Sequence, residues 1–270
     1  NAVVATPATI SLVEGAGLKM VEDATAMNIA NAYMKYEPYY SKKILFNQQI
    51  GNLIHTTDLA VFAGAFAMYD EGLTMPQSQE ALGRMDLTST VLGWASEVNF
   101  VTSASRFGHH VLCSDSNNNV PVYMNFPPPE SLGKGRDSGR DKKNVECPIS
   151  LSSNVHVVTF MFTDGDSITW DLGNFVNSDY DWWMSESRGD FPLSWTFQPV
   201  LQELHPYFLD WVITNMTSND SLIVGPSGAG YAYLDEFPSG ESRRAFVDWT
   251  MANLERVPTM LNMINQIQVN

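Results

Sequence analysis

Four carboxylates in this sequence come shortly after apolar segments that have the pattern of buried strands. They are Asp164, Asp166, Glu97 and Asp115. Two neighbouring carboxylates can hydrolyse a glycosidic bond, because one protonates the leaving oxygen while the other attacks carbon or activates water. We assign these roles to Asp164 and Glu97, in either order. We expect Asp166 to complete the catalytic group and Asp115 to support it beside the substrate. The alternative for each is a helix cap or a solvated loop residue.

A glycine- and tyrosine-rich segment is the second candidate for chemistry. It runs from Gly225 to Pro238 as Gly-Pro-Ser-Gly-Ala-Gly-Tyr-Ala-Tyr-Leu-Asp-Glu-Phe-Pro, directly after the apolar residues 222–224. Glycines permit tight turns and a close approach of the backbone to a ligand. Tyr231 and Tyr233 offer flat faces with a polar hydroxyl, which suit a sugar better than a phosphate. We place Ser227 and both tyrosines at a substrate site; the alternative is a tight turn packed by aromatic rings.

A third segment, 182–195, combines aromatic rings with a guanidinium group. Trp183, Arg188 and Trp195 could stack on and hydrogen-bond to a carbohydrate beside the carboxylates. The alternative is that Trp182 or Trp183 packs inside the fold. The sequence therefore favours a carbohydrate as the partner.

The elements that must position these residues alternate between short apolar strands and helices. We expect strands at 44–46, 60–68, 91–94, 110–113, 155–162, 191–197 and 222–224. We expect helices at 20–37, 77–85, 98–107, 167–176, 199–216 and 242–256. Repeated β-α alternation indicates an α/β fold with parallel strands joined by right-handed crossovers.

This alternation and the chain length favour one TIM-barrel-like (β/α) barrel over residues 1–270, with seven or eight mostly parallel strands. An open doubly wound sheet is the alternative, although no GxGxxG follows the first strand, which counts against its dinucleotide-binding version. Residues 127–148 lack apolar periodicity and are rich in proline, glycine and charge, so we interpret them as an exposed loop or linker.

Composition excludes several classes of partner. Thirty acidic residues against fifteen basic ones give a formal net charge of −15, which repels nucleic acids and anionic membranes. No apolar segment is long enough to insert into a membrane. No Cys/His group has the spacing of a metal site, so we expect neither metal nor cofactor. Cys113 and Cys147 could form a disulfide or remain buried thiols.

Asn215 and Asn219 each begin an Asn-x-Ser/Thr sequence, the acceptor pattern for N-glycosylation. Together with the disulfide that the two cysteines would allow, they weakly favour an extracellular or cell-surface protein.

Gly228 to Tyr233, with Pro238 shortly after, resembles the motif of the GxGYxYP family, whose members are classed as candidate glycoside hydrolases. Further matching segments span about residues 55–240. They are Phe-Thr-Asp-Gly-Asp-Ser at 162–167, Arg-Gly-Asp-Phe-Pro-Leu-Ser-Trp at 188–195, Leu-Gly-Trp at 92–94 with Glu97, Ser-Arg-Phe-Gly at 105–108, and Ser-Asp at 114–115. The resemblance implies a TIM-barrel-like catalytic region, which another domain precedes in secreted bacterial members. Leu234 stands where the strict motif has proline, and Ser167 where the family usually has asparagine.

We therefore expect a secreted carbohydrate-active protein that hydrolyses glycosidic bonds with paired carboxylates. One alternative is an inactive barrel that serves as a structural subunit of an extracellular or filamentous assembly. Its C-terminal tail, 260–269, alternates like a strand and could close the barrel or pair with another copy in an oligomer or fibre. Another alternative is a glycan-binding module without turnover.

Overall fold

The computed structural model of this chain describes residues 8–52, 55–127, 129, 156, 158–176, 182–225, 227–257 and 260–261. The chain divides into two compact units, Asn1–Pro38 and Tyr39–Asn270. The smaller unit contains helices α1 (Ile10–Gly15) and α2 (Ile29–Tyr36). Helix α2 begins later than the predicted 20–37, because the Asn28 side chain caps it by accepting a hydrogen bond from the Asn31 amide.

The larger unit begins with a four-stranded parallel sheet. Its strands are β1 (Ile44–Asn47), β2 (Phe66–Met68), β3 (Thr90–Gly93) and β4 (His110–Cys113), in the order β2-β1-β3-β4. The connecting helices are α3 (Thr57–Phe62), α4 (Pro76–Gly83) and α5 (Glu97–Arg106), and α6 (Val120–Met124) follows β4. Two short 3-10 turns are η1 (Glu37–Tyr39), at the boundary of the two units, and η2 (Ile50–Asn52).

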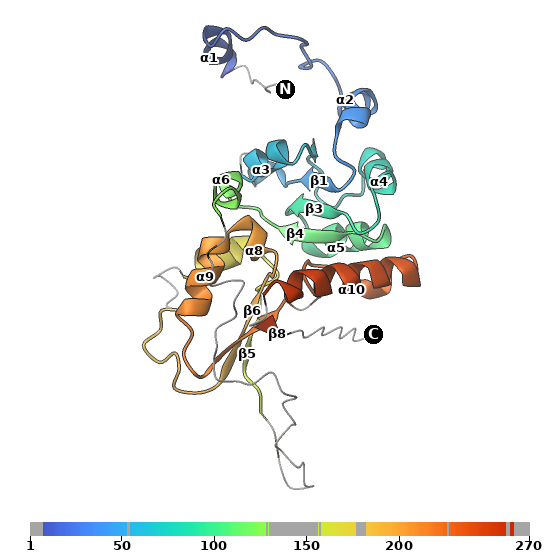
Figure 1. The fold of residues 1–270 in the computed structure, drawn as a ribbon. Coiled ribbons are helices and arrows are strands. Elements are labelled where there is room, and N and C mark those ends of the chain that lie inside the picture. The colour runs from blue at the N-terminus through green and yellow to red at the C-terminus, as the bar shows by residue number, and fades with distance from the viewer. Residues whose placement is uncertain are drawn as a thin grey trace. The chain divides into compact units, whose positions relative to one another are not determined.

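A second four-stranded parallel sheet follows in the same unit. Its strands are β5 (Met161–Phe162), β6 (Leu193–Phe197), β7 (Asp220–Val224) and β8 (Met260–Leu261), in the order β5-β6-β7-β8. Its helical segments are the π-helix η3 (Trp170–Asn174), α8 (Leu201–Leu204), α9 (Pro206–Thr214), the 3-10 turn η4 (Leu234–Glu236) and the long α10 (Gly240–Glu255). Figure 1 shows α10 as the last and longest helix of the described chain.

The α/β class and the parallel strands are confirmed, but the closed barrel is not. Neither sheet is closed, and β1 lies between β2 and β3, whereas a (β/α) barrel places consecutive strands side by side in chain order. The first sheet thus has the strand order of an open, doubly wound fold, the alternative from the sequence.

One hydrophobic core nevertheless joins the two sheets. Phe46 and Leu92 of the first sheet belong to the same buried cluster as Trp195, Phe197 and Leu222 of the second. Two single bridges also cross between them: Val111 pairs with Tyr231 in antiparallel fashion, and Cys113 pairs with Ser167 in parallel fashion. The segments that follow β5 and β7 of the second sheet are thereby brought to β4 of the first.

Three more predicted elements differ from the structure. Of the strand predicted at 155–162, only Met161–Phe162 is a strand among the described residues. The other two differ for physical reasons. Residues 60–62 belong to helix α3 rather than to a strand, because Leu59 and Ala60 are buried while Val61 and Phe62 point outward, as one helical face requires. The predicted helix 199–216 divides into α8 and α9 at Pro206, which starts the second helix.

Two further predictions fall largely outside the described residues. Of the loop predicted at 127–148, only 127 and 129 are described. Of the C-terminal tail, Met260 and Leu261 are described as β8, which pairs with β7 at the edge of the second sheet.

Candidate functional site

The Asp164-Gly165-Asp166 turn after β5 is fixed to the neighbouring strand β6. The Gly165 amide donates a 2.9 Å hydrogen bond to the Thr196 hydroxyl, which in turn donates to the Phe162 carbonyl at 2.9 Å. A Cβ atom on Gly165 would lie 1.9 Å from the Thr196 carbonyl oxygen, so this close approach requires glycine. Asp164 has φ of 80°, a left-handed conformation that is strained for most side chains.

Asp166 is half-buried in this turn and faces the start of the loop after β7. A Cβ atom built on Gly225 would lie 3.4 Å from the Asp166 Cβ. The helix that follows is capped by another residue: the Ser167 hydroxyl accepts the Trp170 amide at 3.2 Å. Burial raises the pKa of Asp166 to about 6, and the negative charges of Asp164 and Glu97 add to this shift. The structure therefore brings the three predicted catalytic carboxylates into one electrostatic group.

Glu97 reaches this group from the first sheet. It is the first residue of α5, just after β3. The Tyr231 hydroxyl donates a 2.8 Å hydrogen bond to the Glu97 carboxylate and lies 3.4 Å from the Tyr233 hydroxyl. Burial, followed by the hydrogen bonds with Tyr233 and Glu97, raises the pKa of Tyr231, so its hydroxyl keeps its proton and acts as a donor.

The glycine-rich loop reaches Glu97 by pairing with the edge of β4. The Tyr231 amide donates to the Val111 carbonyl and the Val111 amide donates to the Tyr231 carbonyl, each at 2.8 Å. Gly230 lies so close to the buried His110 that a Cβ atom there would be 2.5 Å from the imidazole ring. The Tyr233 amide also donates to the Ser105 hydroxyl of α5 at 2.9 Å. This segment thus forms a single antiparallel bridge with β4, which the sequence pattern alone did not indicate.

Asp115 lies close to the carboxylate group from the end of β4. It is half-buried, and its backbone carbonyl accepts a 3.3 Å hydrogen bond from the side-chain amide of Gln48. The pKa of the Cys113 thiol is raised by burial and further by the charges of Asp115 and Asp166, so both carboxylates lie near that sulfur. Ser227 is half-buried in the loop after β7, beyond Gly225.

Three residues predicted to bind substrate lie elsewhere. Trp183 and Trp195 are 1% and 2% exposed and pack in the core, so their faces are not available to a sugar. Arg188 forms an ion pair with Asp220 at 2.5 Å and lies over the Trp183 ring, 4.1 Å from its centroid. The Trp195 indole donates to the same Asp220 at 2.8 Å. Because Asp220 begins β7, these residues form a structural cluster at the opposite end of the strands from Asp164 and Asp166.

Trp94 is a residue that the assignment from the sequence missed. It follows β3, is half-exposed, and stacks on Tyr231 with ring centroids 6.0 Å apart and an angle of 17° between the planes. Its amide donates to the buried Gln48 side chain at 2.9 Å. The sequence signal that could have identified Trp94 was its position between β3 and Glu97.

Several other predictions fall at or outside this site. Within the described ranges, no group of three or more His, Cys, Asp or Glu side chains has the arrangement of a metal site. Cys113 is a free, buried thiol, and Cys147 lies outside the described residues. Asn215 is exposed and Asn219 is half-buried; their glycosylation stays a prediction. In the part of the chain that the structure describes, no helix is long and apolar enough to cross a bilayer.

The fold and the site define an α/β protein with carboxylates gathered at the carboxyl ends of parallel strands. Two family models match it: the GxGYxYP third domain over residues 43–125, and the GxGYxYP putative glycoside hydrolase C-terminal domain over residues 154–269. Together they cover well over half of the chain, which therefore belongs to the GxGYxYP family. The first sheet lies in the third domain and the second sheet in the C-terminal domain, so both domains contribute to the site.

One solved structure has a similar fold. It is the crystal structure of a putative hydrolase from Bacteroides thetaiotaomicron, with a TM-score of 0.75 and 22% sequence identity. The match covers 93% of this chain and 48% of that one, so the present chain spans about half the length of that protein. No curated protein matches the sequence.

The two departures from the family motif are compatible with the observed geometry. Leu234 is the first residue of η4, a position at which proline also fits a helix. Ser167 caps the helix after the Asp164–Asp166 turn, a role that asparagine performs equally well.

Proposed function

We propose that this protein hydrolyses glycosidic bonds, with Asp166 as the general acid and Glu97 as the nucleophile or the base. The observation that carries the proposal is the convergence of these two carboxyl groups from different sheets, one of them with its pKa raised to about 6. A carboxylic acid that holds its proton near pH 6 can protonate a leaving glycosidic oxygen.

Glu97 is suited to the complementary role because its carboxylate already accepts a hydrogen bond from Tyr231. A charge-assisted hydrogen bond of this kind fixes the orientation of the carboxylate. In a retaining reaction Glu97 would attack the anomeric carbon. In an inverting reaction it would instead take a proton from the attacking water.

Asp164 and Asp115 have supporting roles in this proposal. Asp164 is exposed at the strained start of the turn, and its charge helps to keep the proton on Asp166. Asp115 lies half-buried at the end of β4, where it can accept a hydrogen bond from a substrate hydroxyl. Trp94 and Tyr231 form the aromatic surface on which a sugar ring can stack.

The test is hydrolysis of a panel of oligosaccharides and aryl glycosides by the wild-type protein, Asp166→Asn and Glu97→Gln. We expect cleavage of at least one substrate by the wild type and a loss of at least about 100-fold in each variant. The anomer released first, followed by NMR, distinguishes retention from inversion. Full activity in either variant, with a native circular dichroism spectrum, would show that the two roles are wrongly assigned.

Assembly through the C-terminal tail is a second candidate function with a specific observation behind it. Strand β8 lies at the edge of the second sheet, and an edge strand can pair with another chain. We infer that an inactive or glycan-binding protein could form an extracellular oligomer in this way. Light scattering at increasing concentration tests it: a monomer at all concentrations would remove this candidate.

A further inference from the structure

The carboxyl ends of the strands in the larger unit carry a group of acidic side chains. Four carboxylates lie at the carboxyl ends of strands: Glu97, Asp115, Asp164 and Asp166. In the described part of this unit, none of them forms an ion pair with a lysine or arginine.

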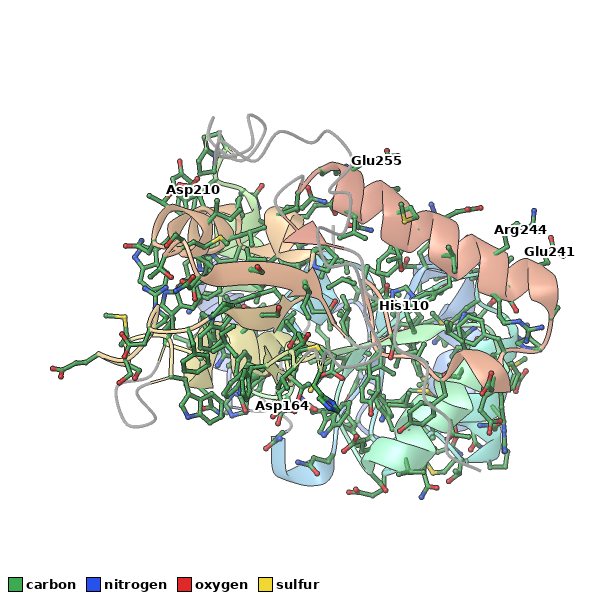
Figure 2. All side chains as sticks on the ribbon, turned by 90° about the horizontal axis from the view of Figure 1, so that it is seen from below. His110, Asp164, Asp210, Glu241, Arg244 and Glu255 are labelled. Carbon is green, nitrogen blue, oxygen red and sulfur yellow. The ribbon has the colours of Figure 1, made fainter. Side chains whose placement is uncertain are left out.

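The described basic residues of this unit lie elsewhere. Lys42 and Lys43 come directly before β1, and Arg188 pairs with Asp220 at the start of β7. Arg106, in the last turn of α5, pairs with Glu236, and Arg256 pairs with Glu203. Figure 2 shows Arg244 on α10, well away from Asp164. Among the described side chains, the charges that act on Asp166 are those of Asp164 and Glu97, both negative.

An uncharged polar group at the same edge points to a ligand with hydroxyl groups. Gln198 follows β6 directly and is 0% exposed, and neither polar atom of its side chain has a hydrogen-bond partner among the described residues. The backbone amide of Gln198 donates a 3.3 Å hydrogen bond to one carboxylate oxygen of Asp171. The other oxygen of Asp171 has no hydrogen-bond partner among the described residues. Unsatisfied buried polar groups are costly, and a bound molecule is one explanation for them. An amide supplies one acceptor and two donor hydrogens, which suits hydroxyl groups.

Resting on the proposed function, we infer that the site selects glycans without acidic groups and binds those with an amino group most tightly. A uronic acid or a sulfated sugar would bring another negative charge close to carboxylates that already repel one another, as Asp164 and Glu97 repel the charged form of Asp166. An ammonium group on the sugar would instead compensate the carboxylates, which form no ion pair with a described lysine or arginine. A neutral sugar would fall between the two.

The experiment uses trisaccharides of one backbone that differ only in charge. Sulfur-linked β-1,4-glucan trimers resist hydrolysis and can be prepared neutral, with a 2-amino group, or oxidised to the 6-carboxylate; an α-1,4-linked set covers the other anomer. Binding to the wild-type protein is measured by calorimetry at about pH 6.5 in low salt. We expect the amine to bind about tenfold more tightly than the neutral trimer, and the acid about tenfold more weakly. The differences should shrink as salt is added.

A charge-neutralising variant locates the effect. Asp115→Asn should reduce the discrimination between the amine and the acid several-fold. Glu255→Gln removes the same charge from the exposed end of α10, which lies away from Asp164 in Figure 2, and should leave the discrimination unchanged.

The outcomes separate this inference from the proposed hydrolysis. If the acidic trimer binds as tightly as the neutral trimer, or more tightly, the inference alone is overturned. It is also overturned if Asp115→Asn and Glu255→Gln change the discrimination equally. The expected order of affinities in a protein that cleaves no glycan supports the inference and counts against hydrolysis. If no trimer of either set binds, both proposals fail.

Discussion

The Tyr231 hydroxyl donates a 2.8 Å hydrogen bond to the Glu97 carboxylate across 134 positions of sequence. Tyr231 belongs to the loop after the second sheet's β7, and Glu97 to the helix after the first sheet's β3. The first of the two tyrosines in the family motif thus contacts a carboxylate that lies in the match to the other domain. This contact makes the candidate site dependent on the correct packing of both sheets.

Tyr231→Phe should lower kcat/KM by about 10- to 100-fold, because it removes a hydrogen bond to a charged group worth roughly 1.5–3 kcal/mol. Steady-state kinetics on the best substrate of the panel measures the loss. Tyr233→Phe is the matched control, since its hydroxyl lies 3.4 Å from that of Tyr231 rather than on Glu97, and it should lose less. An equal fall in kcat/KM in both variants would show that the hydrogen bond from Tyr231 to Glu97 has no special role in activity.

Asp166→Asn should abolish activity and yet stabilise the fold above pH 6. Its folded pKa of about 6 lies above the ordinary aspartate value of 3.8, so the folded state retains the proton over a range in which the unfolded chain has lost it. The free energy of unfolding of the wild type therefore falls as pH rises through this range. Asparagine avoids this loss, and we expect a gain on the order of 1–2 kcal/mol at pH 7.5, discounted for partial exposure. Urea denaturation at pH 3.5 and 7.5 tests it; a variant less stable at pH 7.5 contradicts the assigned environment.

Asp164→Gly should raise the free energy of unfolding by about 1 kcal/mol, because glycine adopts the observed φ of 80° without strain. Asp164→Ala is the control: it also removes the carboxylate but keeps a Cβ atom in the left-handed conformation, so it should be no more stable than the wild type. Both variants should lose activity to the same extent. Thermal unfolding monitored by circular dichroism, together with the kinetic assay, separates backbone strain from the loss of charge.

Gly165→Ala should destabilise the protein by at least about 3 kcal/mol, since the new Cβ atom would overlap the Thr196 backbone. For Gly173→Ala, on the π-helix that follows, no atom of the described residues lies within 4 Å of the added methyl group. This control should be neutral or slightly stabilising, because alanine favours helix. Chemical denaturation measures the free energy of unfolding of both variants. Equal values would show that the turn is wrongly described.

Trp195→Phe should lower stability by about 2 kcal/mol and leave kcat/KM within about twofold. The change removes the hydrogen bond from the indole to the buried Asp220, while Arg188 still pairs with that carboxylate. A large rise in KM at unchanged stability would instead return Trp195 to the substrate site.

Local sequence patterns were sufficient for most elements of the two sheets. Apolar runs located β1, β3, β4, β6 and β7 to within a few residues, because buried parallel strands are nearly continuous in hydrophobicity. They were insufficient at 60–62, where a short apolar run fits either a strand or one face of a helix. They also could not give the strand order, which depends on contacts between distant segments.

The candidate site divides in the same way. The sequence by itself determined which carboxylates and tyrosines follow strands, since residue types and their distance from an apolar run are local properties. Only the tertiary structure decided that Glu97 meets Tyr231 and Asp166, that Trp94 joins them, and that Trp183 is buried elsewhere. The physical reason is that side-chain exposure and long-range pairing depend on how the core packs. One hydrophobic cluster holds both sheets together and thereby sets which strand ends are neighbours.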